Sequence, residues 1–261
     1  MIKKILIVVF TTLALTFSVN AGSDGDLILK KNEPTEVKDC FEKINRVTFA
    51  FNQTLDGVIF KPVASLYRKL PSPAKTGVSN SLENISHLLT IPNNFLQGDF
   101  KQAGVNTGRF IINTTLGILG IFDVAQYLGL TNYEKEDYGQ SLAKLGVGPG
   151  CYIVLPVLGP STMRDTVAST FNYFGGDPWY NITVGKDTQY FKNSDYYYSK
   201  GASGIDFRAK NYDSIENLKK NSLDFYASVK SLYLQDRQQK ILNSRKIINT
   251  QNDSDWDEIS Q

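Results

Sequence analysis

The chain has 261 residues, a formal net charge of +2 and a hydrophobic fraction of 41%. This length is enough for one large or two small domains with a hydrophobic core. The nearly balanced charge argues against a nucleic-acid-binding protein, which needs a strongly basic face. Aromatic side chains are plentiful, with 14 Tyr and 15 Phe, and they suit membrane interfaces as well as ordinary cores.

The N-terminus has the pattern of an export signal. Two lysines precede an apolar run from Ile5 to Val19, and small residues around Ala21 form a cleavage site. We predict a cleaved signal peptide over residues 1–21 and a mature chain that starts at Gly22 in a bacterial periplasm. The alternative is an uncleaved membrane anchor, which the short apolar run disfavours.

Both ends of the mature chain are polar. Residues 22–36 predict a flexible leader, and residues 243–261 predict a disordered tail. Between them, helical patterns dominate residues 37–242 and alternation with a period of two is scarce. We therefore predict an all-α fold.

The first predicted helix begins at Asp39. Asp39 as N-cap, with Glu42 three residues later, is an aspartate version of the capping box. Apolar residues recur at helical spacing from Phe41 to Val58. A break or kink is predicted at Lys61-Pro62, followed by a short helix over residues 62–70.

A second long helix is predicted from Ser72-Pro73, with serine as N-cap and proline as first helical residue. It should run to about Leu89 and stop before Pro92. His87, the only histidine of the chain, lies near its end. We interpret a lone histidine there as structural or solvated rather than catalytic.

The central stretch runs from Gly108 to Ala125. Arg109 and Asp123 enclose an uncharged run of about 13 residues. A membrane-spanning helix needs about 20 apolar residues, so this run is too short to cross a bilayer. Asp99 is predicted to cap a helix that continues through it.

Gly117 and Gly120, spaced by three, would leave one face of that helix bare for close packing. A second uncharged stretch, Leu145–Met163, contains three prolines that forbid a continuous helix. Two membrane-like segments that cannot span suit either a protein that sits in one leaflet or a compact soluble core. Periodicity alone favours the soluble core, and both interpretations stay open.

The remaining elements follow in order. The charged patch Glu134–Asp137 predicts a solvated loop. Thr162 with Asp165 resembles a capping box that starts another helix. Residues 172–204 predict irregular structure, and a long amphipathic helix is predicted from Ser214 to Leu242.

Catalytic signatures are missing from the sequence. One histidine and two cysteines form no nucleophile–base or metal-ligand cluster, and there is no Gly-x-Ser-x-Gly elbow or phosphate loop. We therefore predict a protein that is not an enzyme, with no catalytic residues, no metal and no cofactor. Arg164-Asp165 is a charge pair that is either structural or beside a polar passage.

Cys40 and Cys151 would both remain in the mature chain. An oxidising compartment permits a disulfide between them. The sequence does not establish their separation, so the pairing stays open.

Several segments, in order and at characteristic spacing, resemble one known family. They are DCFEKINRVTFAFN (39–52), KPVASLYR (61–68), TGVSN (76–80), NFLQGDFKQA (94–103), GRFIINTTLGILGIFDVA (108–125), DYGQSLA (137–143), residues 146–165 and LDFYASVKSLYLQDR (223–237). This pattern is similar to the MlaA (VacJ) family of outer-membrane phospholipid-retention proteins. The resemblance covers residues 37–242.

The resemblance implies a ring-like arrangement of amphipathic helices that lies in one leaflet of the outer membrane, on its periplasmic side, with Gly/Pro-rich loops. It implies that the protein removes misplaced phospholipid from the outer leaflet and passes it to a periplasmic carrier protein. It also implies association with a trimeric porin. A porin-associated scaffold that moves no lipid is the alternative, and a secreted lipid hydrolase is disfavoured by the single histidine.

A lipid path needs polar groups for the headgroup beside apolar surface for the tails. Candidates for the polar groups are Arg109, Asn113, Thr114, Thr115, Asp123, Arg164 and Asp165. Candidates for membrane contact are Phe110, Ile111, Leu116, Ile118, Leu119, Ile121 and Phe122. Both sets are hypotheses.

The sequence departs from the family pattern in three respects, one of which is Lys43-Ile44 in place of the usual Gly-Phe at the start of the first helix. Many members carry a lipid-modified cysteine just after the signal, and Ala21-Gly22-Ser23 offers none. We therefore expect no acyl anchor. Cys40 and Cys151 stand where the family commonly has proline. Two such changes in one chain strengthen the hypothesis that they form a disulfide.

Overall fold

The computed structural model describes residues 37–131, 134–184 and 190–242. The chain divides into two units, Met1–Glu36 and Val37–Gln261, and all described residues belong to the second. The predicted signal peptide, leader and polar tail lie outside the described residues. Those three assignments stay predictions.

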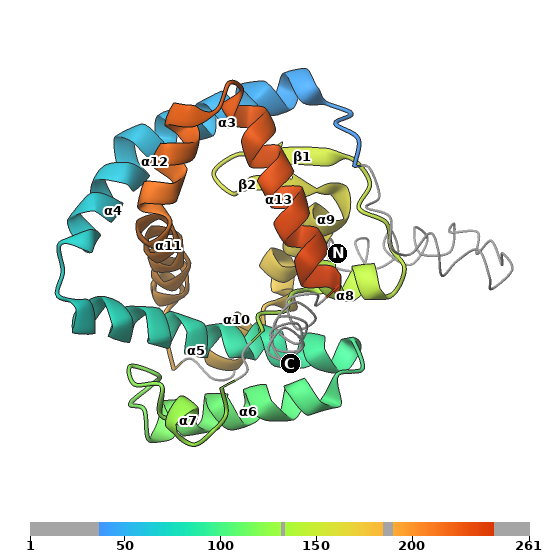
Figure 1. Cartoon of the computed structure of the whole chain (residues 1–261). Coiled ribbons are helices and arrows are strands. Elements are labelled where there is room, and N and C mark those ends of the chain that lie inside the picture. Colours follow the sequence, from blue (N-terminus) through green and yellow to red (C-terminus); the bar gives the residue numbers. More distant parts are fainter. Residues whose placement is uncertain (1–36, 132–133, 185–189, 243–261) are drawn as a thin grey trace, which may run out of the picture. The chain divides into compact units, whose positions relative to one another are not determined.

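The second unit is mostly helical, with one short hairpin in its described part, which confirms the all-α prediction (Figure 1). Its elements are α3 (Glu42–Leu55), the π-helical turn η1 (Asp56–Phe60), α4 (Lys61–Arg68), α5 (Ser72–Leu96), α6 (Phe100–Thr115), α7 (Val124–Tyr127), α8 (Tyr138–Lys144), β1 (Tyr152–Leu155), β2 (Gly159–Thr162), α9 (Met163–Phe171), the π-helical turn η2 (Asn172–Gly176), α10 (Pro178–Thr183), α11 (Asn193–Lys210), α12 (Tyr212–Asn221) and α13 (Phe225–Leu242). Over the described ranges, every helix is too short or too polar to cross a membrane.

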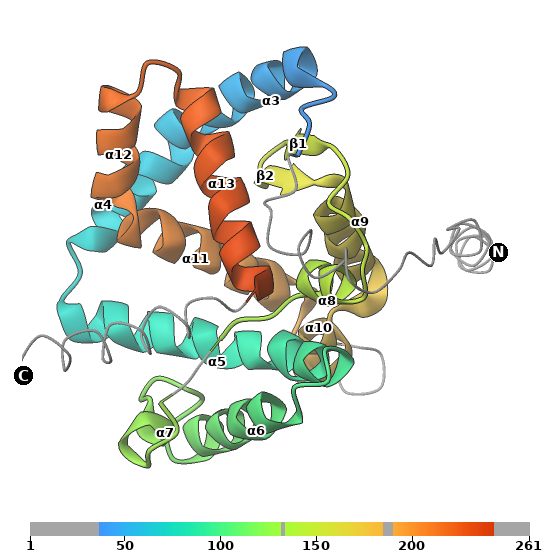
Figure 2. The ribbon, with the colours of Figure 1, turned by 45° about the vertical axis from the view of Figure 1, so that its right-hand side comes forward.

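Within this unit the elements contact one another in a closed series. α3 continues through η1 into α4, α4 packs on α11, and α11 packs on α5. α5 contacts α8, α8 packs on α9, and the β1–β2 hairpin joins α9 back to α3. The ribbons trace a ring in Figure 1, as the resemblance predicted, and α6 and α7 lie outside it against α5 (Figure 2).

The start of α3 differs from the prediction. The helix begins at Glu42 with Phe41 as N-cap, and no side chain caps it. Asp39 was wrongly predicted as N-cap because its carboxylate is engaged elsewhere. It accepts hydrogen bonds from Asn45 at 2.7 Å and from Lys230 at 3.3 Å, which tie the segment before α3 to α13.

The interruption predicted at Lys61-Pro62 is a change of helix type rather than a break. A π-helical turn, η1, precedes α4 directly, and the backbone stays helical through the junction. Pro62 then lies in the first turn of α4, and the change to π-helical hydrogen bonding falls in the residues just before it.

The long helix α5 continues to Leu96 with Pro92 inside it, so the predicted stop before Pro92 was wrong. Ser72 is the first helical residue and not the N-cap. Tertiary contacts hold the last turns in place. Asn93, beyond the proline, is buried and accepts a hydrogen bond of 2.6 Å from Ser141 of α8.

Local cap signals succeeded at two helices. The Asp99 carboxylate accepts from the Gln102 amide at 2.9 Å and caps α6, as predicted. Thr162 accepts from the Asp165 amide at 3.2 Å and caps α9, also as predicted. Among the residues that the structure describes, neither capping side chain has a long-range hydrogen bond that competes with the cap.

The Gly/Pro-rich stretch contains a hairpin that the sequence analysis did not predict. β1 and β2 are antiparallel, with Tyr152 opposite Thr162. Asn45 of α3 holds β1 from one side, because its side chain donates to the Tyr152 carbonyl at 3.0 Å and accepts from the Val154 amide at 2.9 Å. A side chain 107 positions away supplies these bonds, so no local pattern predicts them.

Two predictions in the C-terminal third were wrong. The described residues 172–184 and 190–204 are not irregular, since they hold η2, α10 and the first part of α11. The single helix predicted over Ser214–Leu242 is two helices, α12 and α13. Asp224 causes the division, because its carboxylate accepts from the Ala227 amide at 3.1 Å and from Arg46 at 2.8 Å.

Candidate functional site

The described part of the unit has a polar interior and an apolar exterior. Buried polar side chains outnumber buried apolar ones, and five of the buried apolar residues are alanines. The largest fully buried side chains are Tyr152, His87, Gln140, Asn45, Asn93, Asn94, Asn106, Thr90, Thr162 and Asp177. Soluble domains bury mainly aliphatic and aromatic side chains. This pattern is the reverse of the compact soluble core that periodicity favoured.

The amphipathic first helix shows the reversal directly. Its apolar stripe, which should face a core in a soluble protein, is exposed: Ile44 is 65% exposed and Val47 is 72% exposed. The side chain that α3 buries is Asn45. Further exposed apolar side chains on α3, η1 and α4 are Phe51, Val58, Ile59, Val63 and Leu66. An apolar patch of this extent marks a contact with lipid or another protein.

The central stretch is a helix followed by a tight turn. α6 ends at Thr115, and residues 116–122 fold back, so the helix predicted through the whole stretch was wrong. Ile118 and Leu119 have positive φ of 52° and 55°. The turn is fixed to α5, because the Asn80 side chain donates to the Ile121 carbonyl at 3.1 Å.

Gly120 is needed for that turn and not for a bare helix face. Its φ is +86°, and an added Cβ would lie 2.5 Å from Cβ of Asn84. Glycine alone adopts this conformation without steric cost and leaves room for α5. The prediction of two glycines on one helix face was therefore wrong, although the close approach that it expected is present.

The structure places most of the membrane-contact candidates on this turn. Leu116, Ile118, Leu119, Ile121 and Phe122 are exposed, as is Ile111 on α6, whereas Phe110 is half-buried. The turn therefore presents an apolar tip whose side chains are largely exposed, although Ile121 also lies against Gly77 of α5. Whether this tip touches lipid stays a prediction.

Arg109, Asn113 and Asp123 form one buried hydrogen-bonded cluster. Arg109 pairs with Asp123 at 2.9 Å, and Asn113 donates to the other carboxylate oxygen at 2.8 Å. Arg109 also donates to the Leu130 carbonyl, and Asn113 accepts from the Ala125 amide at 2.9 Å. The cluster joins α6 to the segment around α7, so it supports the turn that carries the apolar tip.

A small cavity beside this cluster has a volume of about 10 Å³, which is room for about one water molecule. Glu83 and His87 of α5 also line it. His87 is 1% exposed, and burial and the nearby Arg109 lower its pKa to about 4. The imidazole is therefore neutral at physiological pH. Burial raises the pKa of Glu83.

Thr114 and Thr115 lie in different environments. The Thr114 hydroxyl accepts a hydrogen bond of 2.9 Å from Asn84 of α5. Thr115 is exposed and donates to the Ile111 carbonyl one turn earlier, at 2.7 Å. Only Thr114 therefore takes part in the contact between α5 and α6.

Arg164 and Asp165 belong to a second cluster, on α8, α9 and α13. Arg164 donates to Asp165 at 2.9 Å. Arg237 contacts both oxygens of Asp165 at 2.9 Å and both oxygens of Asp137 at 2.6 and 2.7 Å. Tyr233 also donates to Asp165, at 2.9 Å. Arg109, Asn113 and Asp123 thus lie in one cluster and Arg164 and Asp165 in another, whereas Thr114 and Thr115 belong to neither.

Gly139 permits this second cluster. An added Cβ would lie 2.3 Å from Oδ1 of Asp165 and 2.4 Å from Nη2 of Arg237. Burial alone would raise the pKa of Asp137 and Asp165, but the Arg237 guanidinium outweighs it and holds both pKa values below the ordinary range. Sequence analysis did not predict Arg237 or Asp137, because Arg237 is 100 residues from Asp137 and 72 from Asp165.

The charged patch Glu134–Asp137 was predicted to be a solvated loop. The structure shows instead that part of this loop, before α8, is buried. Glu136 is 3% exposed and accepts a hydrogen bond of 2.7 Å from Gln97. Burial raises the pKa of Glu136. Asp137 caps α8, accepting from the Gln140 amide at 2.9 Å. The charged patch is thus a junction between α5, α8 and α13.

Cys40 and Cys151 are joined in a disulfide, with Cα atoms 5.6 Å apart. The bond links the segment before α3 to the residue before β1. Both described cysteines are used in it. The disulfide therefore adds a covalent link at the point in the ring of elements where α3 meets the β1–β2 hairpin.

The fold and surface define an all-helical protein with an apolar exterior and a polar interior. The family model for the MlaA lipoprotein matches residues 37–240. The intermembrane phospholipid transport system lipoprotein MlaA of Escherichia coli (strain K12) is 33% identical over 230 residues, which cover 85% of this chain and 84% of that protein. An uncharacterized protein of Rickettsia bellii (strain RML369-C) is 37% identical over 208 residues, 79% of this chain and 78% of that protein.

A solved structure, reported under the words "Structural basis for maintenance of bacterial outer membrane lipid asymmetry", has a similar fold. Its TM-score is 0.65 at 33% identity, and the match covers 78% of this chain and 99% of that one. The chain belongs to the MlaA family.

Proposed function

We propose that this protein maintains the lipid asymmetry of an outer membrane by removing misplaced phospholipid from the outer leaflet and passing it to a periplasmic carrier. Family membership supports the proposal, as do the words "intermembrane phospholipid transport" for the E. coli relative and "outer membrane lipid asymmetry" for the solved structure. The step itself breaks no covalent bond. A trimeric porin is the second proposed partner, and it rests on the family resemblance.

The observation that carries the proposal is the reversal of polarity between interior and surface. An apolar exterior suits lipid surroundings, and short amphipathic helices can lie within a single leaflet. The buried polar side chains hydrogen-bond one another, so the helices can pack together while their apolar faces point outward. Burying about 400 Å² of apolar surface at about 25 cal/mol per Å² would contribute roughly 10 kcal/mol before binding costs.

Replacing Leu119 by aspartate at the apolar tip should weaken membrane association. Aspartate tolerates the positive φ of this position better than leucine does, so the turn itself should survive. In the membrane-bound state Leu119 would be buried in lipid. Losing that burial costs about 2 kcal/mol of transfer free energy, which lowers membrane partition about tenfold or more. The measurement is the fraction of protein that stays with outer-membrane vesicles after a high-salt wash in a density gradient.

Gln126→Asp is the matched control, because Gln126 is exposed on neighbouring α7. It introduces the same charge away from the apolar tip. The membrane-bound fraction of Gln126→Asp should equal that of the unmodified chain. Equal retention of all three proteins would show that the tip does not hold the membrane.

The double change Thr114→Val and Thr115→Val tests the lipid-path hypothesis for the central stretch. Removing the Thr114 hydroxyl leaves the Asn84 amide without its acceptor, so transfer should slow if this contact shapes the path. We expect phospholipid transfer from vesicles to fall severalfold, while Thr115→Val alone should have little effect. Normal transfer by the double variant would remove these residues from the path.

The experiment that tests the function itself is phospholipid extraction. The purified protein, placed in vesicles with labelled phospholipid, should release lipid to a soluble periplasmic carrier without producing fatty acid or lysolipid. Release of fatty acid would favour a hydrolase instead. Tight porin binding with no lipid release would favour the scaffold.

A further inference from the structure

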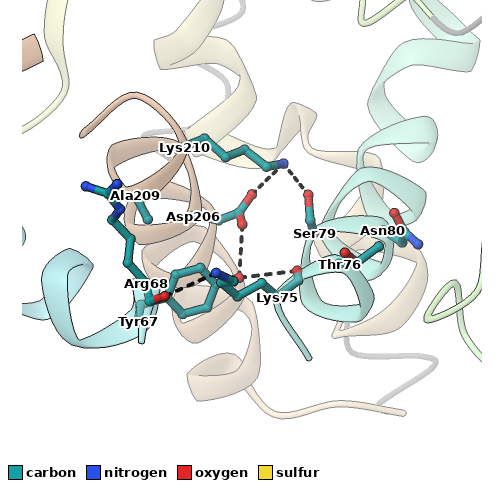
Figure 3. A pocket seen from close by; sticks show the side chains of 9 residues that line it. All are labelled: Tyr67, Arg68, Lys75, Thr76, Ser79, Asn80, Asp206, Ala209 and Lys210. Carbon is teal, nitrogen blue, oxygen red and sulfur yellow. Dashed lines mark hydrogen bonds and ion pairs between the residues drawn. The ribbon is translucent and has the colours of Figure 1, made fainter. Parts of the chain in front are cut away.

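A pocket of about 290 Å³ lies where α4, α5 and α11 meet (Figure 3). The end of α4, the first turns of α5 and the last turn of α11 form its wall. Its lining residues are Tyr67, Arg68, Lys75, Thr76, Ser79, Asn80, Asp206, Ala209 and Lys210. Neither of the two buried clusters contributes a side chain to it.

The lining carries three cations and one carboxylate, so the pocket is net positive. Arg68 is neutralised by Asp213, which it contacts at 3.0 and 2.6 Å. Lys210 pairs with Asp206 at 2.9 Å. Lys75 differs, because its ammonium donates to the Arg68 carbonyl at 3.1 Å and forms no ion pair with any carboxylate in the part of the chain that the structure describes. One cation of the wall is therefore available to an anion.

Hydroxyl groups supply uncharged donors around this cation. Thr76 and Ser79 belong to the same turn of α5 as Lys75, and Lys210 hydrogen-bonds the Ser79 oxygen. Tyr67 donates to Asp206 at 3.0 Å. Burial and Asp206 raise the pKa of Tyr67 to about 12, so the phenol keeps its proton. Asp206 is thus held by two donors, which reduces its repulsion of an incoming anion.

Exposed apolar side chains are sequence neighbours of lining residues on or next to all three helices. Leu66 and Leu70 of the α4 end, Val78 of α5 and Phe207 of α11 are exposed. The volume is at the lower end of small-molecule sites, about 300–1,000 Å³. The pocket therefore has room for a headgroup, with apolar surface outside it for acyl chains.

We propose that this pocket binds the phosphate of a phospholipid headgroup, with Lys75 as its cationic ligand and the Ser79 and Thr76 hydroxyls as donors. Phosphate oxygens accept charge-assisted hydrogen bonds from such groups. The inference rests on the proposed function, since it gives the transported lipid a headgroup contact on the wall of the unit.

Lys75→Gln tests the assignment. The probe is dihexanoyl phosphatidylglycerol below its micelle concentration, with inorganic phosphate and dihexanoylglycerol titrated in parallel. Loss of one charge-assisted hydrogen bond should weaken binding of the phospholipid about tenfold. The unmodified chain should bind the phospholipid more tightly than inorganic phosphate, because only the phospholipid has acyl chains that can contact exposed apolar side chains such as Val78 and Phe207.

Lys101→Gln is the control, because Lys101 is an exposed lysine on α6 outside the pocket. Its affinity should be unchanged, and both variants should unfold at the same temperature as the unmodified chain. Unchanged affinity of Lys75→Gln would overturn the proposal. Inorganic phosphate binding as tightly as the phospholipid would overturn the lipid assignment in favour of a general anion site.

The two proposals fail separately. If the gene lowers surface-exposed phospholipid in its host while Lys75→Gln binds lipid normally, the proposed headgroup site is contradicted and the proposed function is supported. If Lys75→Gln loses affinity for the phospholipid while the gene has no effect on surface phospholipid, the headgroup site is supported and the proposed function is contradicted.

Discussion

Replacing Arg237 by methionine is expected to lower the free energy of unfolding by about 3 kcal/mol. Arg237 bridges Asp137 and Asp165 through four short contacts. The Asp165 side chain is 7% exposed. Removing Arg237 therefore leaves a buried carboxylate with fewer positive partners. The value lies at the low end for breaking a buried ion pair, because Asp137 is partly exposed and Asp165 keeps Arg164.

The measurement is chemical denaturation of the purified chain in mild detergent. Lys240→Met is the matched control one turn further along α13. Lys240 pairs with Asp236 on the surface, and such pairs contribute about 0–1 kcal/mol. A loss as small for Arg237→Met as for the control would show that the buried cluster does not stabilise the unit.

The pH dependence of the free energy of unfolding tests whether the loss comes from the charges of Asp137 and Asp165. The pKa of Asp137 and Asp165 lies below the ordinary 3.8 in the folded chain. The stabilisation is therefore present above that value and is lost as pH falls through the folded-state pKa. In Arg237→Met the main group lowering these pKa values is gone, so both rise. The stability difference between the two proteins should shrink as pH falls, most steeply below the ordinary carboxyl pKa of 3.8.

Reducing the Cys40–Cys151 disulfide is expected to lower the free energy of unfolding by about 4 kcal/mol. The two cysteines are 111 residues apart, and a cross-link across so long a loop removes much entropy from the unfolded chain. The bond also fastens α3 to the hairpin. The measurement compares denaturation with and without reductant.

The double variant Cys40→Ser and Cys151→Ser serves as the control. It should have the stability of the reduced chain, and reductant should not change it further. Mass spectrometry of the unreduced chain should find no free thiol. Two free thiols would show that the protein folds without this bond.

The sequence predicted the helical fold, and local signals predicted two of its caps. The Asp99 and Thr162 caps depend on residues three positions apart, so the sequence carries the whole interaction. The Asp39 cap failed because distant residues engage its carboxylate. The same holds for the stop before Pro92, where Ser141 of α8 holds the following turn in place.

The candidate site was harder to predict because its contacts are long-range. The sequence placed Arg109 and Asp123 at the two ends of the uncharged run, but it did not predict that they pair, as they do at 2.9 Å. Periodicity could not tell which face of α3 is buried, because an amphipathic stripe has the same pattern whether it faces a core or lipid. Only the burial of Asn45 and the exposure of Val47 separate the two interpretations.

The most direct test of the proposed function is the amount of phospholipid exposed on the surface of intact host cells, measured by a membrane-impermeant amine label, with and without the gene. We predict that loss of the gene raises surface-exposed phospholipid and that restoring the gene reverses the increase. Unchanged surface phospholipid, with the protein present in the outer membrane of the unmodified host, would contradict a role in lipid asymmetry.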